Sequence, residues 1–507
     1  MYQLYRERPL LVLGVIAANI LLSMWCLYLD PVINFDGVIY VGIAELFIQG
    51  DYSSAIDYYS WPFYSAFIAF TAKVFSISAD SAAVVFNTAM VISLCLAFIS
   101  IVGQLSNHNR RIVLIAAVAI VLFPSISKYR SFVIRDFGYL SCYLWSLYFL
   151  LRYCTSFNKS HLAAWLFFAG LSSLFRFEGI IFVLIAPYFL FLFTENRANK
   201  RRPLVITVSV TIAASCIALM YWYINDKYMD SVDVARQAGQ DINNLSDLFL
   251  AQMQQRLGND PIGVISLSTL VVSNLGDVVA ELIRRMAIFY LAFVIYAYVK
   301  NLALTNQLQR RIWQIYVGTN LLLLIGFSLS NNFFVSRYAM ATVLTLMILA
   351  PFAIDRLFVA SGRVRLGMII TVALLLLVSL EGLDVRTNKH YIKEAGQWVA
   401  ENTPKEARVY SNNKLAIHYA DRDPHITLKE LYSQDILELF LKNKQVRTMD
   451  YVIAVGQQSN YREDVARQTL GWYFGMPVHM VKGDEGRFAF VFKVTRPQKK
   501  DTSALSG

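Results

Sequence analysis

The chain of 507 residues is 56% hydrophobic and 14% aromatic, and only 16% of its residues are charged. With a mean hydropathy of +0.46, this composition excludes an ordinary soluble globular protein and indicates an integral membrane protein. The formal net charge of +11 does not point to nucleic acid as a partner, because most of the excess Lys and Arg lies in short clusters between apolar stretches, where it sets membrane topology.

Apolar stretches long enough to cross about 30 Å of hydrocarbon predict the transmembrane helices. The first stretch, 9–29, is longer than the core of a signal peptide and no cleavage pattern follows it, so we expect a retained signal anchor. The expected spans are 9–29, 81–105, 112–127, 137–151, 161–175, 179–194, 203–224, 286–299, 313–330, 338–354 and 366–380. We therefore predict a polytopic α-helical membrane protein with about 11 transmembrane helices, in a range of about 10 to 13.

Basic clusters predict the orientation of these spans. The stretch 62–76 is apolar but short, opens on Trp-Pro and carries Lys73. If it lies in the membrane interface instead of crossing, the basic clusters at 6–8, 110–111, 152–159, 197–202, 300–311 and 356–365 all fall on the cytoplasmic side. We therefore predict an interfacial helix and a cytoplasmic N-terminus, with loops 30–80, 128–136, 225–285 and 331–337 and the break at 176–178 on the outer side.

The composition becomes that of a soluble domain from Asp384 onward. We expect domain boundaries at 1–383 for the transmembrane part and 384–507 for an extracytoplasmic mixed α/β domain. "HYIKEAGQWVAENTP" and "LKELYSQDILELFL" predict helices, and "DYVIAV" and "FAFVFKV" predict strands. Turn residues in "VKGDEGRFAFVF" favour a hairpin, and "PQKKDTSALSG" is typical of a disordered tail.

Charged side chains near the membrane gather at the ends of the expected spans, and the middle of each span is free of them. This speaks against an ion-coupled transporter, which needs charges near the midplane. The residues at the outer ends are Asp36, Lys128, Arg130, Arg135, Asp136, Arg176, Glu178, Glu281, Arg284, Arg285 and Arg337. Because basic residues are scarce on the outer side of most membrane proteins, we expect an anionic ligand at this level.

A carboxylate that faces guanidinium groups suits sugar transfer from a lipid phosphate. The basic groups would stabilise the departing phosphate, and the carboxylate would take the proton of the acceptor hydroxyl. The membrane part contains no His pair, Cys/His cluster or Asp-x-Asp, which weakens the case for a zinc hydrolase or a metal-dependent nucleotide-sugar transferase. No cofactor is expected; a divalent metal is optional but not indicated, and no metal ligands are assigned.

Five stretches together resemble the polytopic C-type (GT-C) glycosyltransferases of the protein-mannosyltransferase and lipid A aminoarabinose-transferase group, glycosyltransferase family 39. They are "FDGVIYVGIAELFIQGDY", "WPFYSAFIAFTAKVFSISADSAAVVFNTAM", "VIRDFGYLSCYLWSLYFLLRY", "GLSSLFRFEGIIFVL" and "FFVSRYAMATVLTLMIL". The resemblance covers roughly the whole chain, and its specificity comes from the order of the motifs. It implies a GT-C-like fold and a polyprenyl-phosphate sugar as donor.

The resemblance also implies a set of site residues. Asp36 matches the family's catalytic base, Tyr40 and Ala44 follow it at helical spacing, and similarity suggests a second acid at Asp136. The remaining candidates for substrate binding are Asp57, Tyr59, Lys128, Arg130, Arg135, Arg176, Glu178, Arg337 and Tyr338. Two departures are evident: the family often has two adjacent acids at the first motif, where this chain has Asp36-Gly37, and the WWDYG stretch of oligosaccharyltransferases has no counterpart, which disfavours transfer of a whole oligosaccharide.

Structural explanations compete with each of these roles. Asp36 could cap the helix that follows it, and Arg135 with Asp136 could form a local ion pair at the start of span 137–151. Arg176 and Glu178 could simply be the turn between two spans, because charges within a span cost several kcal/mol. The acids at 51 and 57 could be solvated, and Arg337 with Tyr338, like the aromatic residues at 58–64, could belong to an interfacial belt.

The sequence therefore predicts an inverting membrane glycosyltransferase of the cell envelope, in the inner membrane of a bacterium. Its partners would be a polyprenyl-phosphate sugar, a lipid, glycan or protein acceptor, and membrane lipids. The alternative is a flippase or binding protein for lipid-linked sugars that performs no chemistry. This alternative would need a polar path across the membrane, whereas the polar groups lie on one side.

Overall fold

The fold is described by a computed structural model of the chain. The structure describes residues 8–193, 263–331, 336–359, 389–422, 449–457 and 463–494, together with single helical positions at 205, 206, 208, 209, 366, 369, 370, 372, 373 and 377. The chain divides into two compact units. The first comprises Met1–Asn19, Met90–Ile126 and Arg135–Glu381, and the second comprises Ile20–Ala89, Ser127–Ile134 and Gly382–Gly507. Because the second unit combines the C-terminal region with the first loop, the boundary expected at 383/384 stays a prediction.

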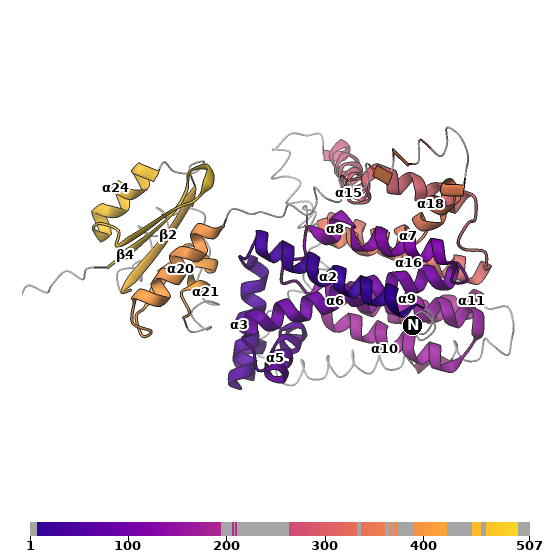
Figure 1. Ribbon diagram of the computed structural model, residues 1–507, viewed down its shortest axis with the longest axis horizontal. Helices are drawn as coiled ribbons and strands as arrows, with labels where there is room; N and C mark the ends of the chain where they lie inside the picture. Colours follow the sequence, from indigo (N-terminus) through magenta and orange to yellow (C-terminus); the bar gives the residue numbers. More distant parts are fainter. Residues whose placement is uncertain are drawn as a thin grey trace, which may run out of the picture. The chain divides into compact units, whose positions relative to one another are not determined.

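Helices account for nearly all of the described membrane part (Figure 1). From the N-terminus they are α2 (Pro9–Leu29), α3 (Phe35–Gln49), α4 (Tyr52–Tyr58), α5 (Phe63–Phe75), α6 (Ala79–Leu105), α7 (Arg110–Val121), α8 (Pro124–Ser127), α9 (Asp136–Ser156), α10 (Lys159–Phe175) and α11 (Gly179–Phe193). They continue with α15 (Gly263–Val299), α16 (Gln307–Asn331), the 3-10 turn η1 (Ser336–Ala339), α17 (Met340–Met347) and α18 (Ala350–Val359). The bounds of α2 coincide with the first predicted span.

Within the described residues, three helical stretches are long and apolar enough to cross a membrane: Pro9–Leu29, Ala79–Leu105 and Arg110–Ser127. The segments Arg337–Met347 and Ala350–Val359, bent by 44°, would together make a fourth. The predicted spans 203–224 and 366–380 lie largely outside the described residues. The total of eleven spans therefore stays a prediction.

The prediction that residues 225–285 form one loop is wrong at its C-terminal end, because α15 already begins at Gly263 and runs for 37 residues. Glu281 pairs with Arg284 and Arg285, one turn further along the same helix. These i,i+3 and i,i+4 pairs satisfy the charges locally, so the helix continues through them instead of ending there. The charges that were expected at a span end thus lie inside a longer helix.

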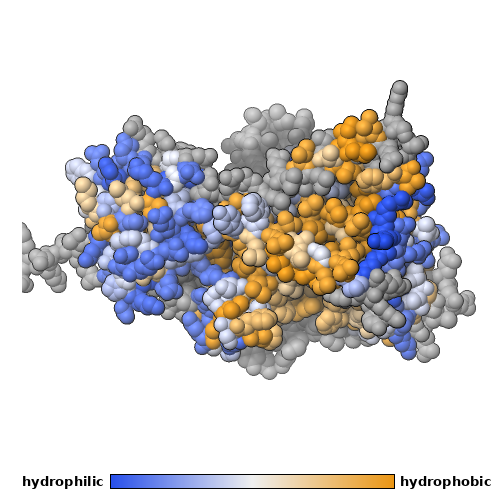
Figure 2. All heavy atoms as spheres, viewed as in Figure 1, coloured by the Kyte–Doolittle hydropathy of each residue, from blue (hydrophilic) through white to orange (hydrophobic). Residues whose placement is uncertain are grey.

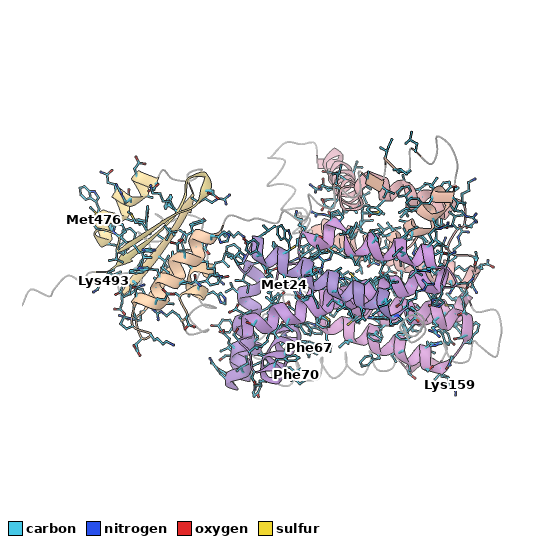
Figure 3. All side chains as sticks on the ribbon, in the orientation of Figure 1. Met24, Phe67, Phe70, Lys159, Met476 and Lys493 are labelled. Carbon is cyan, nitrogen blue, oxygen red and sulfur yellow. The ribbon has the colours of Figure 1, made fainter. Side chains whose placement is uncertain are left out.

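The outer surface of the helices is largely hydrophobic. On α2, Val12, Val15 and Cys26 are buried, while Leu10 and Met24 on other sides of the helix are 82% and 62% exposed. Figure 2 shows a broad hydrophobic face over the helices, and Figure 3 labels Met24 there. Apolar side chains exposed on this scale are stable only against lipid, as expected for an integral membrane protein.

Helix α5 is the stretch that was predicted to lie in the interface. It has 13 residues, which at 1.5 Å each give about 20 Å, too short for about 30 Å of hydrocarbon. It packs against α3, and the Tyr64 hydroxyl donates a hydrogen bond to Asn87 of α6 at 2.8 Å. Phe70, labelled in Figure 3, is 67% exposed. These features agree with an interfacial helix; the orientation of the chain in the membrane stays a prediction.

The C-terminal region contains a mixed four-stranded sheet. Its elements are α20 (His390–Asn402), β1 (Val409–Ser411), α21 (Lys414–Tyr419), β2 (Tyr451–Gln457), α24 (Glu463–Phe474), β3 (His479–Lys482), the 3-10 turn η3 (Asp484–Gly486) and β4 (Arg487–Lys493). The strand order is β1-β2-β4-β3, with β1 parallel to β2 and the other pairs antiparallel. The predicted strands and hairpin are therefore found. The second predicted helix, "LKELYSQDILELFL", and the tail lie outside the described residues.

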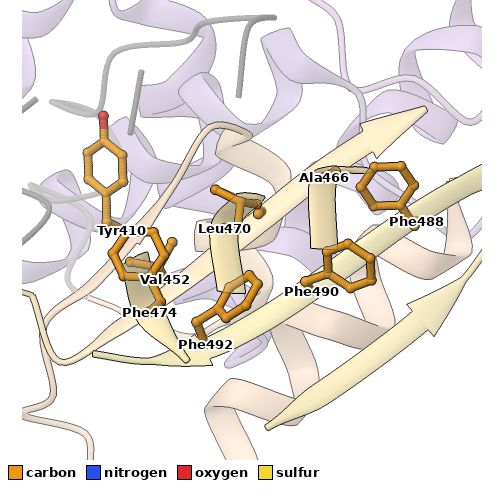
Figure 4. Close-up of a cluster of buried hydrophobic side chains, with 9 residues drawn as sticks. Tyr410, Val452, Ala466, Leu470, Phe474, Phe488, Phe490 and Phe492 are labelled. Atoms are coloured by element: carbon orange, nitrogen blue, oxygen red, sulfur yellow. The ribbon is translucent and has the colours of Figure 1, made fainter. Parts of the chain in front are cut away.

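Both faces of this sheet are covered. Phe488, Phe490 and Phe492 alternate along β4 and pack with Leu470 and Phe474 of α24 (Figure 4). On the opposite face, Trp398 of α20 stacks on His479, with the ring centroids 4.9 Å apart. Since His479 pairs with Val491, its side chain lies on the face away from the three phenylalanines.

We expect Phe490→Ala to destabilise the C-terminal sheet by about 3 to 5 kcal/mol, because the ring is fully buried and its loss leaves a cavity. Hydrogen exchange at the β2 amides of the purified chain in detergent would measure the loss. Trp472→Ala is the matched control, since this α24 side chain is 85% exposed. Equal protection in the two variants would contradict the packing described here.

Candidate active site

Four charged side chains from separate stretches of the chain meet in the first unit. Asp136 is the first residue of α9, Arg176 and Glu178 form the turn between α10 and α11, and Arg337 lies in η1. Arg176 Nη1 lies 2.5 Å from Asp136 Oδ1, and its Nη2 contacts Glu178. Arg337 Nε lies 3.7 Å from the other Asp136 oxygen. We call these four residues the charge cluster.

Arg176 is the centre of the cluster. Its side chain and that of Asp136 are 6% and 5% exposed, so water screens their attraction only weakly. The guanidinium also lies over the ring of Tyr338, 4.0 Å from the centroid, and 5.6 Å from that of Tyr139. Two aromatic faces and two carboxylates therefore surround one cation, which fixes the orientation of its planar fork.

These contacts change the acid–base properties of the turn. Burial alone would lower the pKa of Arg176, but Asp136 and Glu178 outweigh burial and raise it. Burial would likewise raise the pKa of Glu178, whereas Arg176, through its charge and its hydrogen bond, lowers it. Arg135, which precedes α9, adds to this lowering by its charge. Glu178 is thus held as a carboxylate and Arg176 as a cation.

A close approach of α9 to α10 brings Asp136 to Arg176. A Cβ at Gly138 would lie 2.5 Å from the buried Phe175 ring, so a side chain at this position would push the two helices apart. Gly138 is two residues from Asp136, and Phe175 directly precedes Arg176. Gly138 therefore allows the short distance between α9 and α10 on which the ion pair of Asp136 with Arg176 depends.

The charge cluster borders a cavity of about 310 Å³ in the first unit. The lining residues are Asp136, Tyr139, Leu140, Arg176, Glu178, Asn320, Leu322, Leu323, Leu324, Gly326, Phe327, Arg337, Tyr338 and Ala341. Charged groups thus share one space with a wall of leucine and phenylalanine from α16. Such a lining fits an amphiphile with an anionic head and a hydrocarbon tail.

Five of the predicted site residues line this cavity: Asp136, Arg176, Glu178, Arg337 and Tyr338. They came from three different motifs, and the sequence did not show that they would meet. Two further lining residues with polar groups were missed. Tyr139 follows Asp136 by three residues, one helical turn, and Asn320 is a buried amide inside the apolar stretch 313–330. The sequence offered one signal for each residue: Tyr139 lies one helical turn after an acid, and Asn320 is an amide within an apolar span.

None of the other predicted residues is among those that line this cavity, although Arg135 adjoins Asp136 in the sequence. Asp36, Tyr40, Asp57, Tyr59, Lys128 and Arg130 belong to the second unit. Asp36 is half-buried in the first turn of α3, but Asn34 holds the N-cap position, so the explanation of Asp36 as the cap residue is wrong. Arg130 is buried, and the Lys128 ammonium lies 5.9 Å from the ring of Tyr129.

The aromatic and acidic residues of the first loop have structural contacts. The rings of Tyr59 and Tyr64 pack edge-on against Tyr40, at 6.2 and 4.9 Å. Asp51 caps α4 by accepting a hydrogen bond from the Ser54 amide at 3.1 Å. Asp57 is exposed on α4. Among the residues that the structure describes, no group of three or more His, Cys, Asp or Glu is placed to hold a metal ion.

We expect Arg176→Met to cost about 3 kcal/mol of stability, because Glu178 loses its cation and the buried Asp136 keeps only Arg337, at 3.7 Å. A lower melting temperature in detergent would measure this cost. Arg284→Met is the control: its side chain is 73% exposed, and Glu281 keeps Arg285 as a partner. An unchanged melting temperature for Arg176→Met would contradict the ion-pair geometry.

We expect the stability of the protein to depend on pH through Glu178. Because its pKa is lowered in the folded chain, this carboxylate contributes stability above its ordinary pKa of 4.5, and the contribution is lost as the pH falls through the lowered value. The melting temperature of Glu178→Gln should thus fall less steeply than that of the wild type as the pH drops below about 4.5. Glu394→Gln, at an exposed position on α20, should retain the wild-type slope.

Comparison with known proteins agrees with this architecture. Residues 60–222 match the family of dolichyl-phosphate-mannose-protein mannosyltransferases. No curated protein sequence matches the chain. Among solved structures, an oligosaccharyltransferase from Archaeoglobus fulgidus, tethered to an acceptor peptide with the NVT sequon, is 12% identical, with a TM-score of 0.52 over 96% of this chain and 74% of that one.

ArnT from Cupriavidus metallidurans is similar in two structures. In the apo state it is 13% identical, with a TM-score of 0.53, and bound to undecaprenyl phosphate it is 13% identical, with a TM-score of 0.51. Each alignment covers 95% of this chain and 97% of ArnT. The predicted fold class and the predicted resemblance are thereby confirmed: the protein is an integral membrane protein of the GT-C fold, similar to protein mannosyltransferases and to ArnT.

Proposed function

We propose that the protein is a membrane glycosyltransferase, in which a polyprenyl-phosphate sugar is the donor and a hydroxyl of a lipid, glycan or protein is the acceptor. The family match at residues 60–222 supports this reaction class. The two neighbours support the partners, since one was solved with undecaprenyl phosphate and another with an acceptor peptide. As predicted from the sequence, we place the reaction at the outer leaflet of a bacterial inner membrane.

The observation that carries the proposal is the cavity at the charge cluster. It offers guanidinium groups and an apolar wall within one space, which are the two surfaces that a polyprenyl phosphate presents. At about 310 Å³, the cavity is near the lower limit for small-molecule sites, so it would hold the phosphate and the first part of the tail. The rest of the tail would lie in lipid along the helices.

The two arginines of the cluster differ in how deeply they are buried. Arg176 is buried and shared between two carboxylates, and we assign it the role of holding Asp136 and Glu178 in place. Arg337 is more exposed, at 22% of its side chain, and lines the same cavity, with its Nε 3.7 Å from Asp136. We therefore assign the donor phosphate to Arg337.

The reaction then proceeds as a single displacement. A carboxylate accepts the proton of the acceptor hydroxyl, the hydroxyl oxygen bonds to the anomeric carbon, and the bond from that carbon to the phosphate oxygen breaks. The phosphate leaves with one more negative charge than it carried in the donor, and the configuration of the sugar is inverted. The family resemblance assigns the base to Asp36, and a guanidinium at the phosphate stabilises the charge that develops there.

We expect Arg337→Ala to lower the transfer rate by about 100-fold, because the charge that develops on the phosphate loses its guanidinium. Transfer from a labelled polyprenyl-phosphate sugar in proteoliposomes would measure the rate. Arg337→Lys should recover part of it, since a point charge replaces the fork. Arg467→Ala, at an exposed position of α24, is the matched control. Wild-type rates in Arg337→Ala would overturn the assignment of the phosphate site.

We expect Asp36→Asn to lower the same rate by about 100-fold or more, because an amide cannot take the acceptor proton. Binding of the donor should persist, since the proposed phosphate site is intact. Asp484→Asn, an exposed change in η3, should behave as the wild type. If the wild type and Asp36→Asn move the lipid across the membrane equally and neither makes product, the flippase alternative is favoured instead.

A further inference from the structure

Residues 30–34 lead into α3 and are held from two sides within the second unit. On one side, the side chain of Asn34 forms two hydrogen bonds with the backbone of Val133. Asn34 Nδ2 donates to the Val133 carbonyl oxygen at 3.3 Å, and Asn34 Oδ1 accepts from the Val133 amide at 2.7 Å. Asp36 follows in the first turn of α3. The position of its carboxylate therefore depends on what holds this segment.

The C-terminal domain supplies contacts on the other side. The hydroxyl of Tyr419, the last residue of α21, accepts a hydrogen bond from the Ile33 amide at 2.8 Å. Lys393 of α20 donates to the Pro31 carbonyl at 3.3 Å. The Lys389 ammonium lies 5.6 Å from the ring centroid of Phe35. Two hydrogen bonds to the backbone, at Pro31 and Ile33, and one contact with the Phe35 ring thus hold the segment directly before Asp36.

A further contact joins α21 to the start of α6. His418 Nε2 lies 3.1 Å from Asp80 Oδ1, and the His418 ring packs edge-on against Tyr419 at 5.1 Å. Asp80 is in the first turn of α6. Helix α21 therefore contacts both the lead-in to α3 and the start of α6.

The contacting helices are themselves firmly packed. Helices α20 and α21 lie against each other, and Ile392, Ala395 and Leu415 are buried within them. The Lys393 ammonium lies 5.3 Å from the ring of Tyr419, which ties together the two side chains that bind the segment. A rigid pair of helices can transmit the position of the C-terminal sheet domain to a short loop.

We propose that Tyr419 and Lys393 are positioning residues through which the C-terminal domain fixes residues 31–35 and, with them, the carboxylate of Asp36. This inference rests on the proposed role of Asp36 as the base. In this role the C-terminal domain supports the active site by positioning the base, and this role does not depend on whether the domain also contacts the acceptor. A small displacement of a base is sufficient to slow proton transfer strongly.

The test compares Tyr419→Phe with the wild type in the full-length chain. The substitution keeps the ring and removes the hydroxyl that accepts the Ile33 amide. We expect kcat to fall by about tenfold or more, with the KM for the polyprenyl-phosphate sugar unchanged. Hydrogen exchange in the peptide that covers Ile33 should become faster. Tyr473→Phe, at an exposed tyrosine of α24, is the matched control and should change neither quantity.

Lys393→Met provides a second variant should Tyr419→Phe fail to fold. It removes the contact to Pro31 and should change kcat and exchange in the same direction, by less. An unchanged kcat, or unchanged exchange at Ile33, would overturn the inference. If the wild type transfers no sugar, the proposed function is wrong, but this result alone does not overturn the contacts between the C-terminal domain and residues 31–35. The exchange data then decide separately whether the C-terminal domain holds this segment.

Discussion

One buried guanidinium organises the first unit at the level of the cavity. Arg176 binds the start of α9 through Asp136 and its own turn through Glu178, and it lies against Tyr338 of η1. Three chain segments are thus joined by one side chain. Because apolar residues of similar size would often stabilise a protein as well as a buried ion pair does, a cluster of this kind beside a cavity fits the phosphate site that we propose there.

The residues of this cluster could be predicted one by one, but their meeting could not. Charges at the ends of apolar spans pointed to Asp136, Arg176 and Arg337 separately. Their convergence depends on how closely α9 approaches α10 at Gly138, which is a property of packing between helices and not of span length. The same limit explains α15: an uncharged stretch predicts a span, but local pairing of Glu281 lets the helix extend beyond it.

Local sequence signals were also reliable in the C-terminal domain, where the hairpin of β3 and β4 follows from turn residues between β-rich stretches. The parallel pairing of β1 with β2 joins residues about 40 positions apart and left no comparable signal. The contact of Tyr419 with Ile33 spans 386 positions. No pattern in either stretch indicates the other, so the domain was predicted as a separate module, whereas its helices α20 and α21 contact the first loop.

The packing around Gly37 leaves little room for a side chain directly after Asp36. A Cβ at this position would lie 2.6 Å from Ile33 Cγ1 and 2.9 Å from the Asn34 side-chain oxygen, which is already bonded to Val133. Any side chain at position 37 would therefore have to displace the side chains of Ile33 and Asn34. Tyr419 and Val133 hold these two residues, so Gly37 lets α3 begin directly against this segment.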